Sequence, residues 1–295
     1  MEGLSDPQVW SGLIFLSSLL LLGMPHGAVD HDLYYHPRRP SNLQLLAFCS
    51  IYLAIAGFLV ALWWFLPVLS AWGLIFLTWY HWGEGDWTFE KQNGGEGNPV
   101  KFPFAVWRGA LPMMVPALGN PELYVEVMEA AIRIVGHEPG GAFRWLVTQQ
   151  AWWSLILGLV ILFSFHGLAL RRANLSSHQL RRYGLEDLFL ILLFVSLPPL
   201  ASIGLYFSFW HSRRHIITVA RKLGGDYLNE EKKVAWLHFY KRAAPFSIGG
   251  ILMIVIVYLL AQSLQWDLTS LISAYLIILW ALTWPHAIIC KKKLI

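Results

Sequence analysis

Five of the eleven histidines lie at or just beyond the end of a long apolar segment, where their imidazoles could gather around a metal ion. They are His26, His81, His211, His215 and His286. Clusters of imidazole suit Fe, Zn, Cu or Ni better than Ca or Mg, and burial favours the neutral ring, which is the form that binds metals. The residue types therefore indicate a metal centre and leave the identity of the metal open.

His211 and His215 have the spacing of two ligands on one helix face. They are four residues apart, so on a helix they project about one turn from each other, close enough to bind the same ion. The same spacing beside Arg213 and Arg214 is also typical of an amphipathic helix at a membrane surface. The pair alone does not distinguish these two structures.

Three acidic residues stand close to two of the other histidines. Asp30 follows His26 by about one helical turn, and Glu84 and Asp86 follow His81. Metal-bound imidazoles usually donate their second N–H to a carboxylate or a carbonyl, so these acids are candidates for that supporting role. The alternative is that they are solvated acids in loops.

His286 follows Pro285, as His26 follows Pro25. It is a candidate for the same supporting set, for a fifth metal ligand, for a substrate contact or for an interfacial residue. The sequence leaves these alternatives open.

The composition shows which kind of scaffold must position these side chains. Of the 295 residues, 56% are hydrophobic and 14% are charged, whereas a soluble domain has about a quarter charged residues. We therefore expect residues 1–295 to form a single integral-membrane domain in contact with the lipid bilayer. The formal charge of +4 is small, so no nucleic-acid partner is expected. Cys49 and Cys290 form no metal or redox motif and are expected to be packing residues.

Long apolar segments predict an all-α fold, a polytopic membrane helix bundle of about seven transmembrane helices. The predicted spans are 9–24, 43–64, 67–82, 145–170, 188–210, 246–264 and 268–289. Segment 102–118 is also apolar but contains Arg108 and three prolines, which remove backbone donors from a helix. We expect 102–118 to be re-entrant or interfacial.

The distribution of lysine and arginine predicts the orientation, because cytoplasmic loops collect these residues. With seven spans, the best separation puts the amino terminus outside, the carboxyl terminus in the cytoplasm and the protein in the cell membrane. The basic residues left outside are then Arg171, Arg172, Arg181 and Arg182. In this arrangement four spans running inward bring the five histidines to one depth near the cytoplasmic face, where a polar group suggests a functional site.

Four short motifs carry a resemblance to a known family. They are PHGAVDH at 25–31, YHWGEGD at 80–86, FWHSRRH at 209–215 and TWPH at 283–286, with RGALPM at 108–113 between them. In this order, and over nearly the whole chain, they resemble the Brp/Blh family of membrane β-carotene 15,15′-dioxygenases. The match depends on the motifs together and not on any one of them.

The resemblance implies an activity and a set of site residues. The activity is cleavage of the central double bond of β-carotene by dioxygen, giving two molecules of retinal. The implied cofactor is Fe(II), held by His26, His81, His211 and His215. Asp30, Glu84, Asp86 and His286 are then expected to support these ligands. A hydrocarbon substrate dissolved in the bilayer would reach an apolar pocket at membrane depth, where open positions on the metal could bind dioxygen.

Three other classes of membrane protein are rivals to this interpretation. A rhodopsin needs a lysine in a late span for its Schiff base, and there is none between Phe246 and Cys290. A desaturase or hydroxylase gathers more histidines, in repeated boxes, than this chain offers. A haem-binding electron-transfer subunit needs two facing histidines, whereas four or five gather here. The last two remain alternatives.

Overall fold

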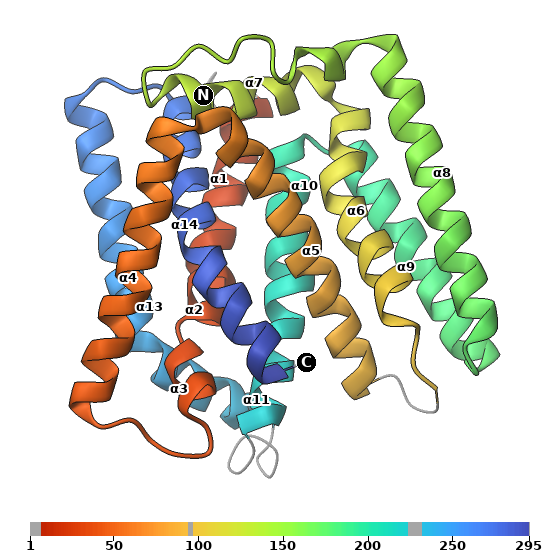
Figure 1. Cartoon of the computed structure of the whole chain (residues 1–295), viewed down its shortest axis with the longest axis horizontal. Coiled ribbons are helices and arrows are strands. Elements are labelled where there is room, and N and C mark those ends of the chain that lie inside the picture. Colours follow the sequence, from red (N-terminus) through yellow and green to blue (C-terminus); the bar gives the residue numbers. More distant parts are fainter. Residues whose placement is uncertain (1–6, 94–96, 224–231, 295) are drawn as a thin grey trace.

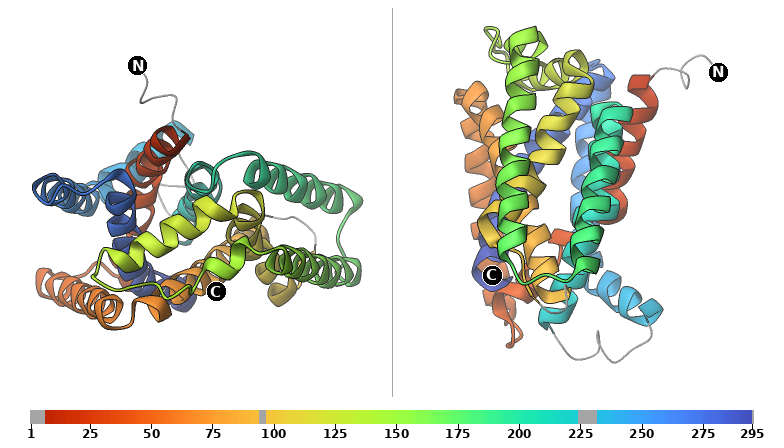
Figure 2. Two further views of the ribbon diagram at one scale, coloured as in Figure 1. Left: turned by 90° about the horizontal axis from the view of Figure 1, so that it is seen from above. Right: turned by 90° about the vertical axis from the view of Figure 1, so that its right-hand side faces the viewer.

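The computed structural model describes residues 7–93, 97–223 and 232–294, and every regular element within them is a helix. This confirms the predicted all-α class. Five stretches of the described residues are long and apolar enough to cross a membrane: Val9–Tyr35, Asn42–Phe65, Gln149–Arg172, Trp236–Ser263 and Leu268–Leu294. The helices lie side by side in a bundle of elongated cross-section, with α4, α13 and α14 toward one side and α8 and α9 toward the other (Figure 2).

The first membrane-length stretch is built from several helical pieces. They are α1 (Pro7–Ser18), a π-helical turn η2 (Leu19–Gly23), α2 (Met24–Gly27) and α3 (Asp30–Tyr35). α4 (Asn42–Phe65) returns after a capping box in which Ser41 and Gln44 bond each other's backbone N–H. α5 (Pro67–Asn93) runs back beside it, carries the predicted third span in its first half and continues into polar residues (Figure 1).

Segment 102–118, predicted to be re-entrant or interfacial, is not among the described stretches that are long and apolar enough to cross a membrane, and it does not lie on the surface of the bundle. It forms α6 (Lys101–Gly119), which packs inside the bundle along α5 and against α8 and α9 (Figure 1). Gly83 and Gly109 permit the close approach of α5 and α6, because a Cβ on either would lie 1.9 Å from a carbonyl oxygen of the other helix. Arg108 is fully buried among carboxylates of other helices. Hydropathy could not reveal these distant partners.

The predicted span 188–210 is also not one helix. α9 (Ser177–Ser196) ends before Leu197 and Pro198, and the chain turns back as α10 (Pro199–Tyr206), the π-helical turn η4 (Phe207–Ser212) and α11 (Arg213–Leu223) (Figure 1). Proline disfavours helical geometry in the residue before it, which explains the break. α9 was missed because its first half is polar; Gln179 and Asp187 there are buried, and Asp187 pairs with Arg108 of α6.

The courses of α6 and α9 change the side on which four arginines lie. After α6, helix α7 (Pro121–Arg133) crosses one end of the bundle, here named the α7 end, and α8 (Gln149–Arg172) runs away from it (Figure 1). The α8–α9 connection therefore lies at the opposite end, here named the basic end, together with the α3–α4 connection and the end of α14. Arg171, Arg172, Arg181 and Arg182, predicted on the other side, thus join Arg38, Arg39 and the three terminal lysines.

The last two helices complete the bundle. α13 (Lys232–Ser263) packs against α2 and α14, and α14 (Leu268–Leu294) also packs against α4, α5 and α7. The two termini of the described chain lie at opposite ends (Figure 1). α14 therefore runs through the bundle from the α7 end to the basic end and carries His286 near its close.

Candidate metal centre and apolar cavity

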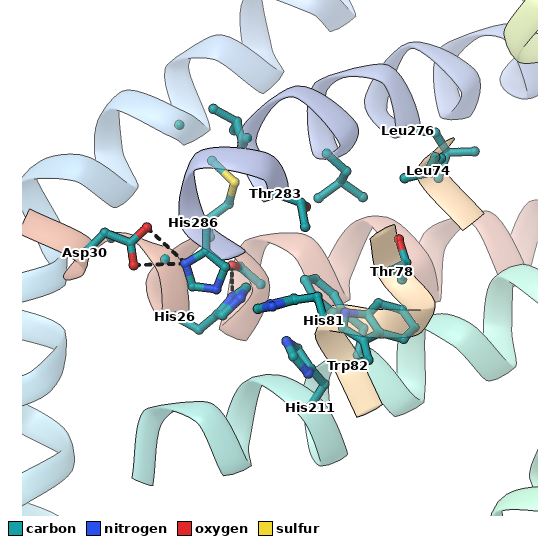
Figure 3. Close-up of a pocket in the computed structure, with 18 of the residues that line it drawn as sticks. His26, Asp30, Leu74, Thr78, His81, Trp82, His211, Leu276, Thr283 and His286 are labelled. Atoms are coloured by element: carbon teal, nitrogen blue, oxygen red, sulfur yellow. Dashed lines mark hydrogen bonds and ion pairs between the residues drawn. The ribbon is translucent and has the colours of Figure 1, made fainter. Parts of the chain in front are cut away.

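Five imidazoles meet in the interior, contributed by four segments that are distant in the sequence. The ring of His286 lies 4.8 Å from that of His26, 5.0 Å from that of His81 and 4.9 Å from that of His215, between ring centroids. The ring of His211 lies 5.0 Å from that of His81 and 5.5 Å from that of His26. All five side chains are buried, and four of them are drawn in Figure 3. We name this group the histidine cluster.

Two π-helical turns help to place these rings. η2 comes just before His26, and η4 contains His211, and the two turns contact each other. A π-turn inserts one residue into an α-helix and frequently occurs at functional sites. His211 and His215 remain one turn apart, with nearly parallel rings 6.2 Å from each other, so both reach the histidine cluster.

The free nitrogens of the cluster suit a metal ion. The Nδ1 of His26 hydrogen-bonds the carbonyl of Gly23, which can only accept, so Nδ1 donates and Nε2 is left available. The Nε2 atoms of His81 and His211 are buried and have no hydrogen-bond partner. A buried nitrogen without a partner is costly unless another ligand satisfies it. Ligand atoms of His26, His81 and His211 lie within 4.8 Å of one another.

A second group of three possible ligands adjoins the first. His215, His286 and Cys290 also offer atoms within 4.8 Å of one another. The Sγ of Cys290 lies 3.6 Å from Nε2 of His286 and 3.9 Å from Nε2 of His215. Cys290 was expected to be a packing residue, but the structure places its thiol at the histidine cluster. Its position one helical turn after His286 is the signal that could have indicated this.

The three acidic residues suggested by the sequence have different surroundings. Asp30 accepts from Nδ1 of His286, with both carboxylate oxygens at 2.9 Å, and its Oδ2 lies 3.3 Å from the hydroxyl of Tyr52. Glu84 instead contacts Lys101 at 2.5 Å and accepts from Tyr80. Asp30 therefore fixes a cluster imidazole, whereas Glu84 pairs with Lys101 at the start of α6 and with Tyr80 on its own helix. Tyr52 was not identified from the sequence.

Asp86 belongs to a buried charge network on another side of α5. The network, as defined here, consists of Asp86, Glu90, Arg108, Arg182, Glu186, Asp187 and Arg214. Arg214 lies between His211 and His215 in the sequence, and its guanidinium nitrogens are 3.2 Å from oxygens of both Asp86 and Glu186. Since α5 carries His81 as well as Asp86, the network ties the helices that deliver three of the five imidazoles.

A large apolar cavity meets the histidine cluster. Its volume is about 510 Å³, and His26, His81, His211 and His286 line it together with side chains from α1, α4, α5, α7, α10, α13 and α14. Figure 3 shows these four histidines between Asp30 on one side and Leu74 and Leu276 on the other. A mostly apolar cavity with a few convergent polar groups is typical of a site for a small apolar ligand.

Comparison with known proteins agrees with the resemblance stated above. The family model described as Beta-carotene 15,15'-dioxygenase matches residues 17–292. The chain is 28% identical to a protein of Halobacterium salinarum named "Probable beta-carotene 15,15'-dioxygenase Blh", over 92% of this chain and 81% of that protein. It is 22% identical to the "Beta-carotene 15,15'-dioxygenase" of an uncultured marine bacterium, 66A03, over 93% of this chain and 90% of that protein. No solved structure gives a significant match. The chain therefore belongs to the beta-carotene 15,15'-dioxygenase family.

Proposed function

We propose that this protein is an Fe(II)-dependent enzyme that cleaves the central 15,15′ double bond of β-carotene with dioxygen and releases two molecules of all-trans-retinal. The observation that carries the proposal is a buried cluster of five imidazoles that opens onto an apolar cavity of about 510 Å³. Family membership and the names of the two relatives support the same activity.

We assign the metal ligands to His26, His81, His211 and His215, and we add His286 to the residues that face the metal. The unpaired Nε2 atoms of His81 and His211 support this assignment, as does the arrangement of His26, whose Nδ1 is already bonded. All four assigned ligands are imidazoles, which suit iron as they suit zinc, copper and nickel. Bound iron would supply the activation of dioxygen that the protein's own side chains lack.

The chain's own residues bind and orient the substrate and hold protons in place. The carboxylate of Asp30 keeps the proton of His286 on Nδ1, which leaves Nε2 directed to the cluster. The apolar walls exclude water and favour a hydrocarbon, and they hold it beside the imidazoles in a restricted range of positions. Cleavage of an alkene by dioxygen to two carbonyls requires no general acid or base, so none is assigned.

We further propose that the protein is a single integral-membrane domain of the cell membrane, with the basic end in the cytoplasm and the amino terminus outside. Only Arg133 and Arg144 among the described basic residues belong to elements at the α7 end, whereas the connections and helix ends of the basic end carry most of the others. This asymmetry is what the positive-inside rule requires. The β-carotene would then come from the bilayer.

The test uses the purified full-length protein. We expect about one iron ion per chain, no haem absorption, and conversion of added β-carotene to retinal that a chelator abolishes. His81→Ala and His211→Ala should each lose both iron and cleavage, while His178→Ala, an exposed histidine outside the cluster, should retain both. Normal iron content in both cluster variants would contradict the ligand assignment. A strong pyridine haemochrome signal, or unchanged carotene with iron-loaded protein, would contradict the proposed reaction.

A further inference from the structure

The cavity has one arm that leads from the histidine cluster toward the α7 end. Three helices each present one face to it, since their lining residues recur at intervals of three or four. The positions are Thr78 and Leu74 on α5, Leu282, Leu279 and Leu276 on α14, and Ile203 and Leu200 on α10, which Phe207 of η4 continues. This arm is therefore a channel bounded along its length by packed helices.

Helix α7 closes the far end of this arm. Tyr124, Val127 and Met128 line the cavity there, and Tyr124 and Met128 are buried. α7 is held in place from α4, because the indole of the fully buried Trp63 donates to the carbonyl of Ala131 at 2.8 Å. α7 also packs against α14 and α5. This arm is therefore closed at its far end by α7, a helix that crosses the bundle (Figure 1), and we name it the blind arm.

The cavity opens in the other direction, between α4 and α13. Its lining there includes Cys49 and Leu53 on α4, and Pro245 and Gly249 on α13. Leu53 is 66% exposed, and Pro245 and Gly249 are also exposed. Both helices are apolar segments of membrane-spanning length, so this opening faces the depth of the bilayer and not an aqueous end. A linear apolar molecule can therefore enter sideways, with one end leading.

The blind arm has a defined length along the helices. Leu276 precedes His286 by ten residues, and Leu200 precedes His211 by eleven, which correspond to about 15 Å and about 16 Å of helix. A conjugated polyene is stiff and cannot fold back inside such a channel. Its leading ring would advance until it met α7, and the distance from α7 to the histidine cluster would then decide which double bond lies beside the imidazoles.

We propose that the blind arm acts as a gauge, in which Val127 and Met128 of α7 set the position of the bond that is cleaved. This inference rests on the proposed function. In the reaction one C=C bond breaks, each of its carbons takes one oxygen atom of the same O₂ molecule, and two aldehydes form with no other reactant. For a symmetrical substrate the two aldehydes are equal when the arm matches one half of the molecule.

The test compares two changes of arm length with a matched control on the same helix. Val127→Phe shortens the arm and Met128→Ala lengthens it, whereas Leu123→Ala alters a side chain of α7 that does not line this cavity. With iron-loaded, full-length protein and β-carotene, we expect the share of unequal aldehyde pairs to rise about tenfold in both arm variants, which corresponds to about 1.4 kcal/mol between competing positions. The control should yield retinal as the wild type does.

The reaction of the wild-type protein distinguishes failure of the gauge from failure of the proposed function. If the wild type yields retinal and an iron-loaded Met128→Ala variant yields retinal alone at the same purity, the gauge is refuted while the proposed function stands. If the wild type cleaves no β-carotene, the proposed function itself fails. Met128→Ala removes atoms and adds none. It therefore tests the gauge even if the larger side chain of Val127→Phe disturbs folding.

Discussion

Replacing Arg108 by methionine should strongly destabilise the protein, although the new side chain is apolar and the segment is already hydrophobic. The guanidinium of Arg108 is fully buried, and its nitrogens lie 2.9 Å from Glu186, 3.1 Å from Asp187 and 3.8 Å from Asp86, measured to carboxylate oxygens. Removing one partner of a buried ion pair leaves an uncompensated charge and costs about 3–5 kcal/mol. That is a large part of the roughly 5–15 kcal/mol by which folded domains are typically stable.

The assay is unfolding by a denaturing detergent in mixed micelles, followed by tryptophan fluorescence. Arg171→Met, at the exposed end of α8, is the matched control and should change the free energy of unfolding little. If the loss comes from the orphaned carboxylates, adding Asp187→Asn to Arg108→Met should cost less than the sum of the two single changes. Equal stability of Arg108→Met and the wild type, or strict additivity in the double variant, would refute the reasoning.

Three further predictions follow from particular contacts. Gly83→Ala would place a methyl group 1.9 Å from a carbonyl oxygen of α6, so it should force α5 and α6 apart and lower the unfolding midpoint. The control Gly57→Ala, with no neighbour within 4 Å, should raise the free energy of unfolding by about 0.5–1 kcal/mol. Asp30→Ala removes the carboxylate that fixes the histidine of α14 and should weaken iron binding about 10–100-fold in a chelator-competition titration; unchanged binding would show that this histidine does not face the metal. Hydrogen bonds from Ser270 lower the pKa of Asp267, so this carboxylate stabilises the start of α14 above its ordinary pKa of 3.8 and the contribution disappears as the pH falls through the folded value. Asp267→Ala should therefore cost about 1 kcal/mol at about pH 7 and much less at about pH 3 in parallel unfolding curves.

The fold was predictable from the sequence as far as helices face lipid. α4, α8 and α13 have long apolar stretches with few buried residues. α14 is more buried but is also apolar along most of its length, and hydropathy identified all four helices. α6 and the first half of α9 are different, since their charged residues pair with each other inside the bundle. Arg108 and Glu186 are separated by 78 residues, so no local pattern shows that each neutralises the other. The course of the chain between residues 100 and 210 was not predicted for this reason.

The sequence predicted that the five histidines share one level of the bundle, and they do gather there, but it did not predict their lateral arrangement. Histidines near the same ends of helices that run in one direction share one level, which the sequence already indicates. Which acid supports which imidazole depends instead on tertiary packing. The sequence favoured Glu84 and Asp86 because they are close to His81, but Asp86, five positions further along, points to another side of α5. Glu84 lies on the same face as His81, yet its carboxylate pairs with Lys101 and accepts from Tyr80. Asp30 reaches His286 across 256 residues, a pairing that only packing can reveal.

The two π-helical turns make the length of the chain before each histidine part of the site. Each turn adds a residue relative to an uninterrupted α-helix, and each residue of a helix advances its direction by about 100°. Deleting one residue between Leu19 and Gly23 would let that stretch relax to ordinary helix and swing His26 out of phase with its neighbours. The same deletion within 207–210 would disturb His211. A deletion of one residue, which hardly changes composition or hydropathy, would thus take an imidazole out of the histidine cluster as effectively as replacing the histidine.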